Sequence, residues 1–200
     1  MRRLLFAFMT LLAGACSNSS GPGDTITRAT LNVVRQDSTY KPLLSTTGTF
    51  WAKLGEGRRV RLVYQGYAAS DSGAEFLRFE VPGDGLYRKP DGTPFAAGDS
   101  IQITVTVIDP KRFQFDFQPS GLQFNPSDPA RLRVEYHYAD PDFNGDGNVD
   151  SSDADIEGLL SLWRREPADS VWFKLAAVKS VELEQFDADV LQFSQYAVAW

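Results

Sequence analysis

The sequence predicts a mostly β protein, an antiparallel β-sandwich with one short helix. Several short segments alternate apolar and polar residues with a period of two, and they are rich in β-branched and aromatic side chains. Such alternation is typical of antiparallel strands with one buried face. The alternating segments cover residues 58–64, 76–81, 101–108, 112–118, 131–138 and 181–186.

Turn signals separate these segments. Each one combines proline with glycine, aspartate or asparagine, the residues that favour tight turns. They lie at residues 82–85, 90–92, 109–110, 119–121 and 125–126. Many short strands joined by such turns indicate a sandwich or barrel. The less regular segment from Thr30 to Trp51 is expected to hold one or two edge strands.

A single segment breaks the strand pattern. Residues 151–163 carry apolar side chains at the helical spacing i, i+3, i+4 and i+7, which predicts a helix ending before Pro167. These apolar residues are Ile156, Leu159, Leu160 and Trp163.

The N-terminus has the layout of a secretory signal. Two arginines are followed by an apolar stretch over residues 4–12 and small residues up to Cys16. This layout resembles a bacterial lipoprotein signal, in which the cysteine becomes the lipidated first residue of the mature protein. The resemblance implies a signal peptide at residues 1–15 and a lipid anchor on Cys16. The alternative is a plain secretory signal with an incidental cysteine.

The mature chain is expected to be a tethered acidic domain. Residues 16–28 are polar and small, as in a flexible tether, and residues 29–200 suffice for one core. Loss of residues 1–15 removes two arginines, so the net charge moves from −6 to −6 − 2 = −8. This acidity, with no basic cluster in the sequence, argues against nucleic acid or anionic lipid as partners. Membrane attachment would then come from acyl chains on Cys16, at the outer membrane or cell surface.

The segment DFNGDGNVDSSD, residues 142–153, predicts a calcium site. The EF-hand loop supplies oxygen ligands at positions 1, 3, 5, 7, 9 and 12, with glycine at position 6. Counted from the first aspartate, these positions are Asp142, Asn144, Asp146, the carbonyl of Asn148, Asp150 and Asp153. Gly147 stands at position 6, and Val149 is expected to anchor the loop to the body. Calcium is preferred over magnesium, and the alternative is a solvated acidic loop that binds nothing.

The loop and the helix after it resemble one repeat of a dockerin, a calcium module that docks onto cohesins. Asp153 stands where EF-hands usually carry glutamate, and a predicted strand replaces their entering helix. The resemblance covers residues 142–163 and implies the ligand positions given above. Dockerins carry two repeats, whereas this chain has one. A cohesin-type protein partner recruited through residues 151–163 is therefore kept as an alternative.

Three further segments resemble the bacterial relatives of the ZU-five sandwich. They read FQPSGLQF, PARLRVEY and LQFSQYAVA, at residues 117–124, 129–136 and 191–199. The resemblance runs over residues 76–200 and implies an antiparallel sandwich. The calcium loop and helix, at residues 140–166, would be an insertion in it.

No catalytic set is expected. Some ZU-five-like domains cleave themselves at a His-Phe-Ser step, but here Gln192 precedes Phe193 and Ser194. Glutamine cannot act as the base, and the sole histidine, His137, lies on another predicted strand. A carbohydrate-active enzyme stays as a weaker alternative, since 26 acidic residues make accidental carboxylate pairs inevitable. Core packing is favoured over a sugar-binding platform for the tryptophans, which are Trp51, Trp163, Trp172 and Trp200.

The sequence therefore predicts a non-enzymatic, calcium-stabilised β-sandwich lipoprotein that acts as a binding or structural module.

Overall fold

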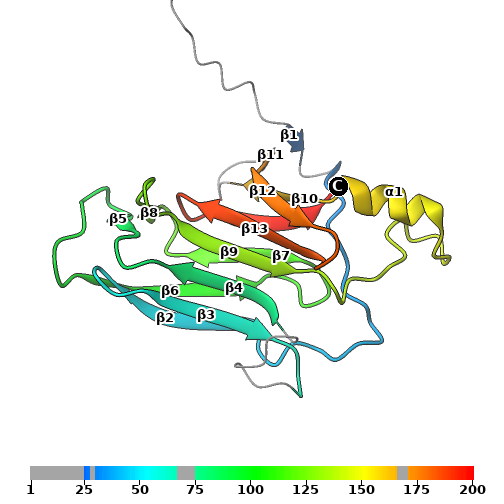
Figure 1. Ribbon diagram of the computed structural model, residues 1–200, viewed down its shortest axis with the longest axis horizontal. Coiled ribbons are helices and arrows are strands. Elements are labelled where there is room, and N and C mark those ends of the chain that lie inside the picture. The colour runs from blue at the N-terminus through cyan, green and yellow to red at the C-terminus, as the bar shows by residue number, and fades with distance from the viewer. Residues whose placement is uncertain (1–24, 28–29, 67–74, 166–170) are drawn as a thin grey trace, which may run out of the picture.

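The computed structural model describes residues 25–27, 30–66, 75–165 and 171–200. They form a sandwich of two antiparallel sheets, with one short helix at its end (Figure 1). The predicted fold class is confirmed. Within the described part of the chain, no helix is long and apolar enough to span a bilayer.

The first sheet has seven strands, in the order β1 (Thr25–Thr27), β11 (Val171–Lys174), β10 (Ser161–Arg165), β14 (Gln195–Ala199), β7 (Gln114–Gln118), β6 (Ser100–Val107) and β2 (Thr47–Lys53). The second has five, in the order β12 (Ala177–Ser180), β13 (Gln185–Val190), β9 (Ala130–Glu135), β4 (Glu75–Val81) and β3 (Arg58–Val63). A small ribbon pairs β5 (Leu86–Arg88) with β8 (Gln123–Phe124), and the helix is α1 (Ser151–Leu159).

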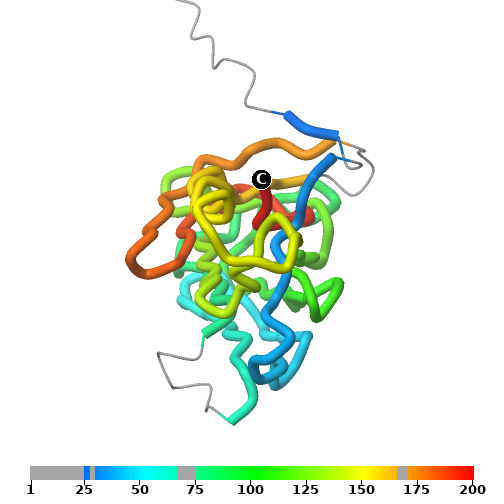
Figure 2. Tube along the Cα trace, turned by 90° about the vertical axis from the view of Figure 1, so that its right-hand side faces the viewer, coloured from blue at the N-terminus to red at the C-terminus, as the bar shows by residue number. Residues whose placement is uncertain are grey.

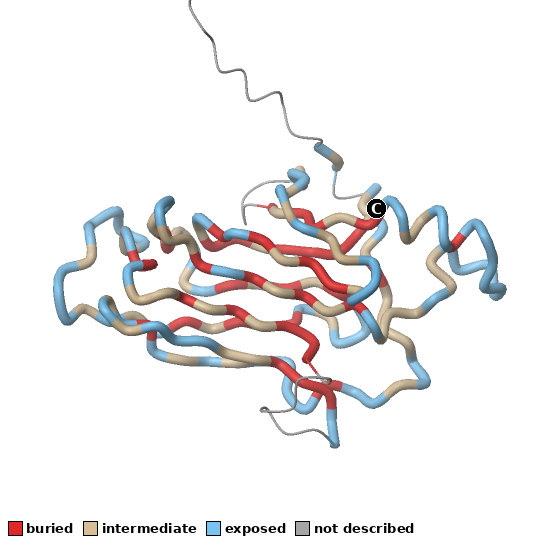
Figure 3. The backbone as a smooth tube through the Cα atoms, viewed as in Figure 1, coloured by how far each residue is buried: buried red, intermediate tan, exposed pale blue. Residues whose placement is uncertain are grey.

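The core lies between the two sheets and consists of the apolar residues of the alternating strands. Figure 3 shows buried residues alternating with less buried ones along several strands. Aromatic rings join the layers: Phe79 of β4 meets Phe117 of β7 with ring centroids 5.1 Å apart. Phe193 packs against both rings at 5.4 Å. Each of these side chains is fully buried, and burying one phenylalanine stabilises the fold by about 1.5–3 kcal/mol.

Most of the predicted strands are present, but one is wrong. Residues 181–184 form the turn of the β12–β13 hairpin, in which Ser180 pairs with Gln185. Val181 and Leu183, read as the buried side of a strand, are 57% and 63% exposed. Glu184 has φ 48°, a conformation that no strand residue adopts. A turn of alternating residues therefore imitated a strand.

The N-terminal part holds the expected edge strand. β2 is the last strand of the seven-stranded sheet. Before it, residues 32–34 run along the end of β14, where the amide of Val34 donates to the carbonyl of Val198 at 2.9 Å. Residues 25–27, assigned above to a tether, instead pair with β11.

The helix is shorter than predicted, because it ends at Leu159 rather than continuing to Trp163. Leu160 has extended backbone angles, φ −52° and ψ 136°, and β10 begins at the next residue. As a strand, Leu162 points into the main core and Trp163 into a second apolar cluster. A strand buries apolar side chains on both of its faces here, which stabilises it more than the helical spacing would stabilise a helix. Residues 161–165 therefore belong to the sheet and not to the loop and helix.

The loop and helix connect the two sheets. β9 ends in the five-stranded sheet and β10 begins in the seven-stranded sheet, so residues 136–160 cross from one layer to the other. Figure 2 looks onto this end, with the loop and α1 in front of the sheets and the N-terminal segment running past the loop.

Candidate functional site

The acidic loop curls around the side chain of Asp142. Its Oδ1 accepts hydrogen bonds from the amides of Gly145, at 2.7 Å, and Asp146, at 3.1 Å, and its Oδ2 accepts from Gly147 at 2.9 Å. Gly145 and Gly147 have φ values of 78° and 91°. Glycine adopts this left-handed region without a steric penalty, which explains why both sharp turns fall on glycines.

Two more predicted ligands continue the same winding. The Oδ1 of Asn144 accepts from the amide of Asp146 at 2.8 Å, and the Oδ1 of Asp146 accepts from the amide of Asn148 at 2.8 Å. The side chains of Asn144 and Asp146 also touch, with Nδ2 3.3 Å from Oδ2. These local turns bring positions 3 and 5 of the loop to one side of it.

Asp153 closes the loop and starts the helix. Its Oδ1 accepts from the amide of Asn144 at 3.1 Å and its Oδ2 from the amide of Asp150 at 3.0 Å. In return, Asp150 caps α1 by accepting from the amide of Ser152 at 2.8 Å. The hydrogen bonds to Asp153, that from Asp150 first, hold its pKa below the usual value. Asp153 is only 2% exposed, so its carboxylate is a buried structural group that joins the loop to the helix.

A distant arginine fastens the loop to the sandwich. Arg35 donates to the carbonyl oxygen of Asp142 at 2.5 Å and lies 3.4 Å from the carboxylate of Asp140. The arginine is 107 residues away in the chain, so no local sequence pattern could have indicated it.

The apolar contact of the loop is not the predicted one. Val149 is 66% exposed, so its predicted role as an anchor is wrong. Phe143 packs edge-on against Trp200 instead, with ring centroids 6.3 Å apart. The ring at position 2 reaches the body because it lies where the chain leaves the sandwich.

The helix is held at its C-terminal end. Lys179 of β12 donates to the carbonyl oxygen of Glu157, and the hydroxyl of Tyr136 donates to its carboxylate at 3.2 Å. A cation near the last carbonyls of a helix is favourable. The loop is thus bound to the sandwich through Arg35, and the end of the helix through Lys179.

The loop brings the predicted ligands near one another, but their carboxylates are not grouped around one point. Among the described residues, no group of three or more His, Cys, Asp or Glu side chains is arranged to hold a metal ion. The aspartates face backbone amides instead. The donor set still fits a hard cation, because it consists of oxygens, and each carboxylate has more lone-pair directions than the amides occupy.

The residues of the self-cleavage motif are not brought together with a base. His137 hydrogen bonds to Glu184, on the β12–β13 turn. Ser194 is 1% exposed, and its hydroxyl has no hydrogen-bond partner in the part of the chain that the structure describes. Cys16 and the signal peptide lie outside the described residues.

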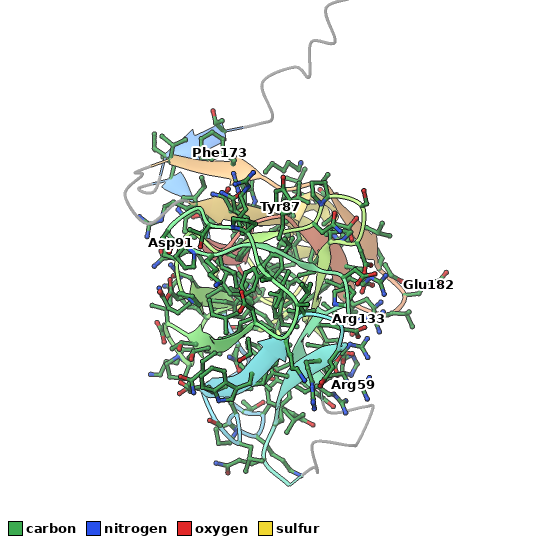
Figure 4. The ribbon with its side chains drawn as sticks, turned by 90° about the vertical axis from the view of Figure 1, so that its left-hand side faces the viewer. Arg59, Tyr87, Asp91, Arg133, Phe173 and Glu182 are labelled. Carbon is green, nitrogen blue, oxygen red and sulfur yellow. The ribbon has the colours of Figure 1, made fainter. Side chains whose placement is uncertain are left out.

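The outer face of the five-stranded sheet corrects one expectation from the sequence. Five arginines gather there from three strands, although no basic cluster is visible in the sequence. They are Arg59, Arg61, Arg78, Arg131 and Arg133, the first and last labelled in Figure 4.

Acidic side chains of the same face balance these arginines. Arg61 and Arg78 pair with the buried Glu75, and Arg133 lies 2.8 Å from Asp187. Burial, and then the charge of Glu75, raise the pKa of Glu135 to about 7. Arg61, Arg78 and Arg133 are therefore engaged within the sheet rather than offered to an anionic partner.

Three of the four tryptophans are at least partly buried, and one is exposed. Trp163 and Trp172 are 7% and 1% exposed, and Trp200 is partly buried against the core, as core packing predicts. Trp51, in contrast, is 60% exposed.

Compared with known proteins, the chain matches no family model, no curated protein and no solved structure. The lipoprotein, dockerin and ZU-five resemblances therefore stay predictions.

Proposed function

We propose that the chain is a non-enzymatic calcium-binding module of the bacterial cell envelope, anchored through a lipid on Cys16. Calcium bound in the loop 142–153 would hold one end of the sandwich together. One observation carries this proposal: the loop with the ligand spacing is tied to Arg35 and joins the two sheets. Ordering the loop would therefore fasten the connection between the two layers at this end of the sandwich.

The charge of the loop explains why an ion would matter. Its aspartates at positions 142, 146, 150 and 153 lie within twelve residues, and the loop itself contains no basic residue. Backbone amides offset part of the repulsion between these carboxylates, and a divalent cation would offset more. Extracellular modules bind calcium with dissociation constants of about 10⁻⁴–10⁻³ M. At about a hundred times that concentration the fold gains about 2.7 kcal/mol, a large share of a typical 5–15 kcal/mol.

Calorimetric titration of the mature chain with calcium tests the proposal. Wild-type protein should release or absorb heat that saturates at one ion per chain, and Asp146→Ala should lose the signal. Asp155→Ala is the matched control, because it removes the same charge from an exposed helix position outside the ligand set. Equal heats for wild type and Asp146→Ala would contradict the proposal.

The second candidate is a calcium-dependent adaptor that recruits a protein through α1. Leu159 favours it, because this large apolar side chain at the end of the helix is 65% exposed. Trp163 cannot contribute, since it is buried in β10. A pull-down from envelope extract should then depend on calcium and be lost in Leu159→Asp; capture that is unchanged by either treatment would reject this candidate.

A further inference from the structure

The outer face of the seven-stranded sheet carries few charges over about half its width. Strands β2, β6 and β7 alternate core residues with mostly hydroxyl and amide side chains that face outward, and Gln195 of β14 adds one more. The outward residues are Thr47, Thr49, Trp51, Lys53, Ser100, Gln102, Thr104, Thr106, Gln114, Asp116, Gln118 and Gln195. Two of these twelve carry a charge, Lys53 and Asp116. The other half of this face is covered by the N-terminal segment and the second apolar cluster.

The strand register arranges these side chains in rows across the sheet. Three successive rows are Trp51–Gln102, Thr49–Thr104–Gln118 and Thr47–Thr106–Asp116–Gln195. Neighbouring strands lie about 4.8 Å apart, so four strands span about 14 Å. Some groups are already held in place: the hydroxyls of Thr49 and Thr104 lie 3.3 Å apart, and Gln118 donates to Asp116 at 2.8 Å. The rows therefore form a preorganised polar surface.

Trp51 stands at the edge of this surface. It is 60% exposed although its whole strand is paired with β6, so the exposure does not come from a loop. The other two sheet tryptophans, Trp163 and Trp172, are buried. A single exposed apolar residue needs no explanation. An indole next to rows of amides and hydroxyls offers both a ring face and hydrogen-bonding groups to one ligand.

The chemistry of the face selects among possible ligands. A protein interface needs an apolar centre. The two exposed apolar side chains here are far apart along β6: Trp51 pairs with Gln102 near its start, and Ile108 follows its last residue. A nucleic acid needs cations for its phosphates, and Lys53, at the border, is already paired with Glu56 at 2.6 Å. An uncharged ligand rich in hydroxyl groups matches the face.

We propose that the outer face of β2, β6 and β7, with Trp51, binds a neutral polysaccharide. Amides and hydroxyls donate to and accept from sugar hydroxyls, and the indole packs on the C–H face of a sugar ring. The surface is an open sheet rather than a cleft, so it suits a polymer chain more than a free monosaccharide. This binding goes beyond the calcium function and does not depend on it.

Native affinity electrophoresis tests the proposal. The mature chain is run through gels that contain dextran, mixed-linkage β-glucan, xylan or galactomannan, with the anionic polymer alginate as a comparator. At least one neutral polymer should retard the protein and shift its tryptophan fluorescence. Trp51→Ala should weaken the retardation about tenfold, Gln102→Ala should weaken it less, and Trp51→Phe should restore part of it.

The matched control is Tyr87→Ala, which removes another exposed aromatic ring, 43% exposed on β5 (Figure 4). It should leave the retardation unchanged, as should Asp146→Ala and a chelator, which separates this surface from the calcium loop. The melting temperature of Trp51→Ala shows whether the variant is folded. Retardation by none of the neutral polymers, by alginate alone, or to the same degree in Trp51→Ala would overturn the proposal.

Discussion

The body of the sandwich and the acidic connection at residues 140–160 are stabilised in different ways. Between the sheets, rings such as Phe79 and Phe117 are buried against each other, and this stabilisation does not depend on ions. The connection buries few apolar groups, and carboxylates such as Asp142 and Asp153 order it by accepting backbone amides. The stability of the connection therefore depends on the charges of its carboxylates. Removing calcium or protonating these carboxylates should loosen the connection while the core stays intact.

The largest effect is expected in the core. Phe117→Ala removes a fully buried ring between the two sheets and should lower the free energy of unfolding by about 3–5 kcal/mol. Urea denaturation measures it, with and without calcium. The loss should be the same in both conditions, because the rings that pack on Phe117 belong to the sandwich and not to the loop. A loss that appears in only one condition would contradict the view that the two regions are stabilised independently.

Calcium removal should have the next largest effect. Chelation should lower the free energy of unfolding of wild type by about 2–3 kcal/mol when calcium had been far above its dissociation constant. Asp146→Ala should show no such loss, while Asp155→Ala should behave as wild type. Thermal melts in calcium and in chelator measure this, and an equal response of all three proteins would argue against stabilisation by calcium bound in the loop.

The two regions should respond to pH in opposite directions. Glu135, on the body, has a pKa raised to about 7 by burial, so its contribution is present below its unfolded pKa and is lost as pH rises through 7. Asp153, in the loop, has a lowered pKa, so its contribution is present above the unfolded pKa and is lost as pH falls through the folded one.

Glu135→Gln isolates the first of these effects. The variant should gain about 1–2 kcal/mol relative to wild type between pH 5 and 8, after allowance for solvent screening. Denaturation at a series of pH values measures it. A constant difference between the two proteins over this range would show that Glu135 does not titrate there.

The smallest effect is expected at the attachment of the loop. Arg35→Gln removes a half-exposed guanidinium that binds the carbonyl of Asp142 and the carboxylate of Asp140. The global free energy of unfolding should fall by only about 0.5–1 kcal/mol. Calcium affinity should fall as well, because the loop loses its support. An unchanged calcium affinity by calorimetry would show that Arg35 does not support the loop.

The sequence predicted what local patterns can encode. Alternation gave the sandwich and most strands, and the spacing from Asp142 to Asp153 gave a loop whose turns fall on glycines. It failed where long-range packing decides. The apolar spacing through Trp163 suits a helix, but pairing with β14 buries Leu162 and Trp163 on two faces. The contact of Arg35 with the loop spans 107 residues, beyond any local pattern.

Amide hydrogen exchange with and without calcium tests the central claim most directly. Calcium should slow exchange at the loop amides of Gly145, Asp146 and Gly147 and along α1, while β6 and β7 exchange as before. Asp146→Ala should show no calcium effect. Loop amides that exchange at the same rate in calcium and in chelator would contradict the claim that calcium fastens this end of the sandwich.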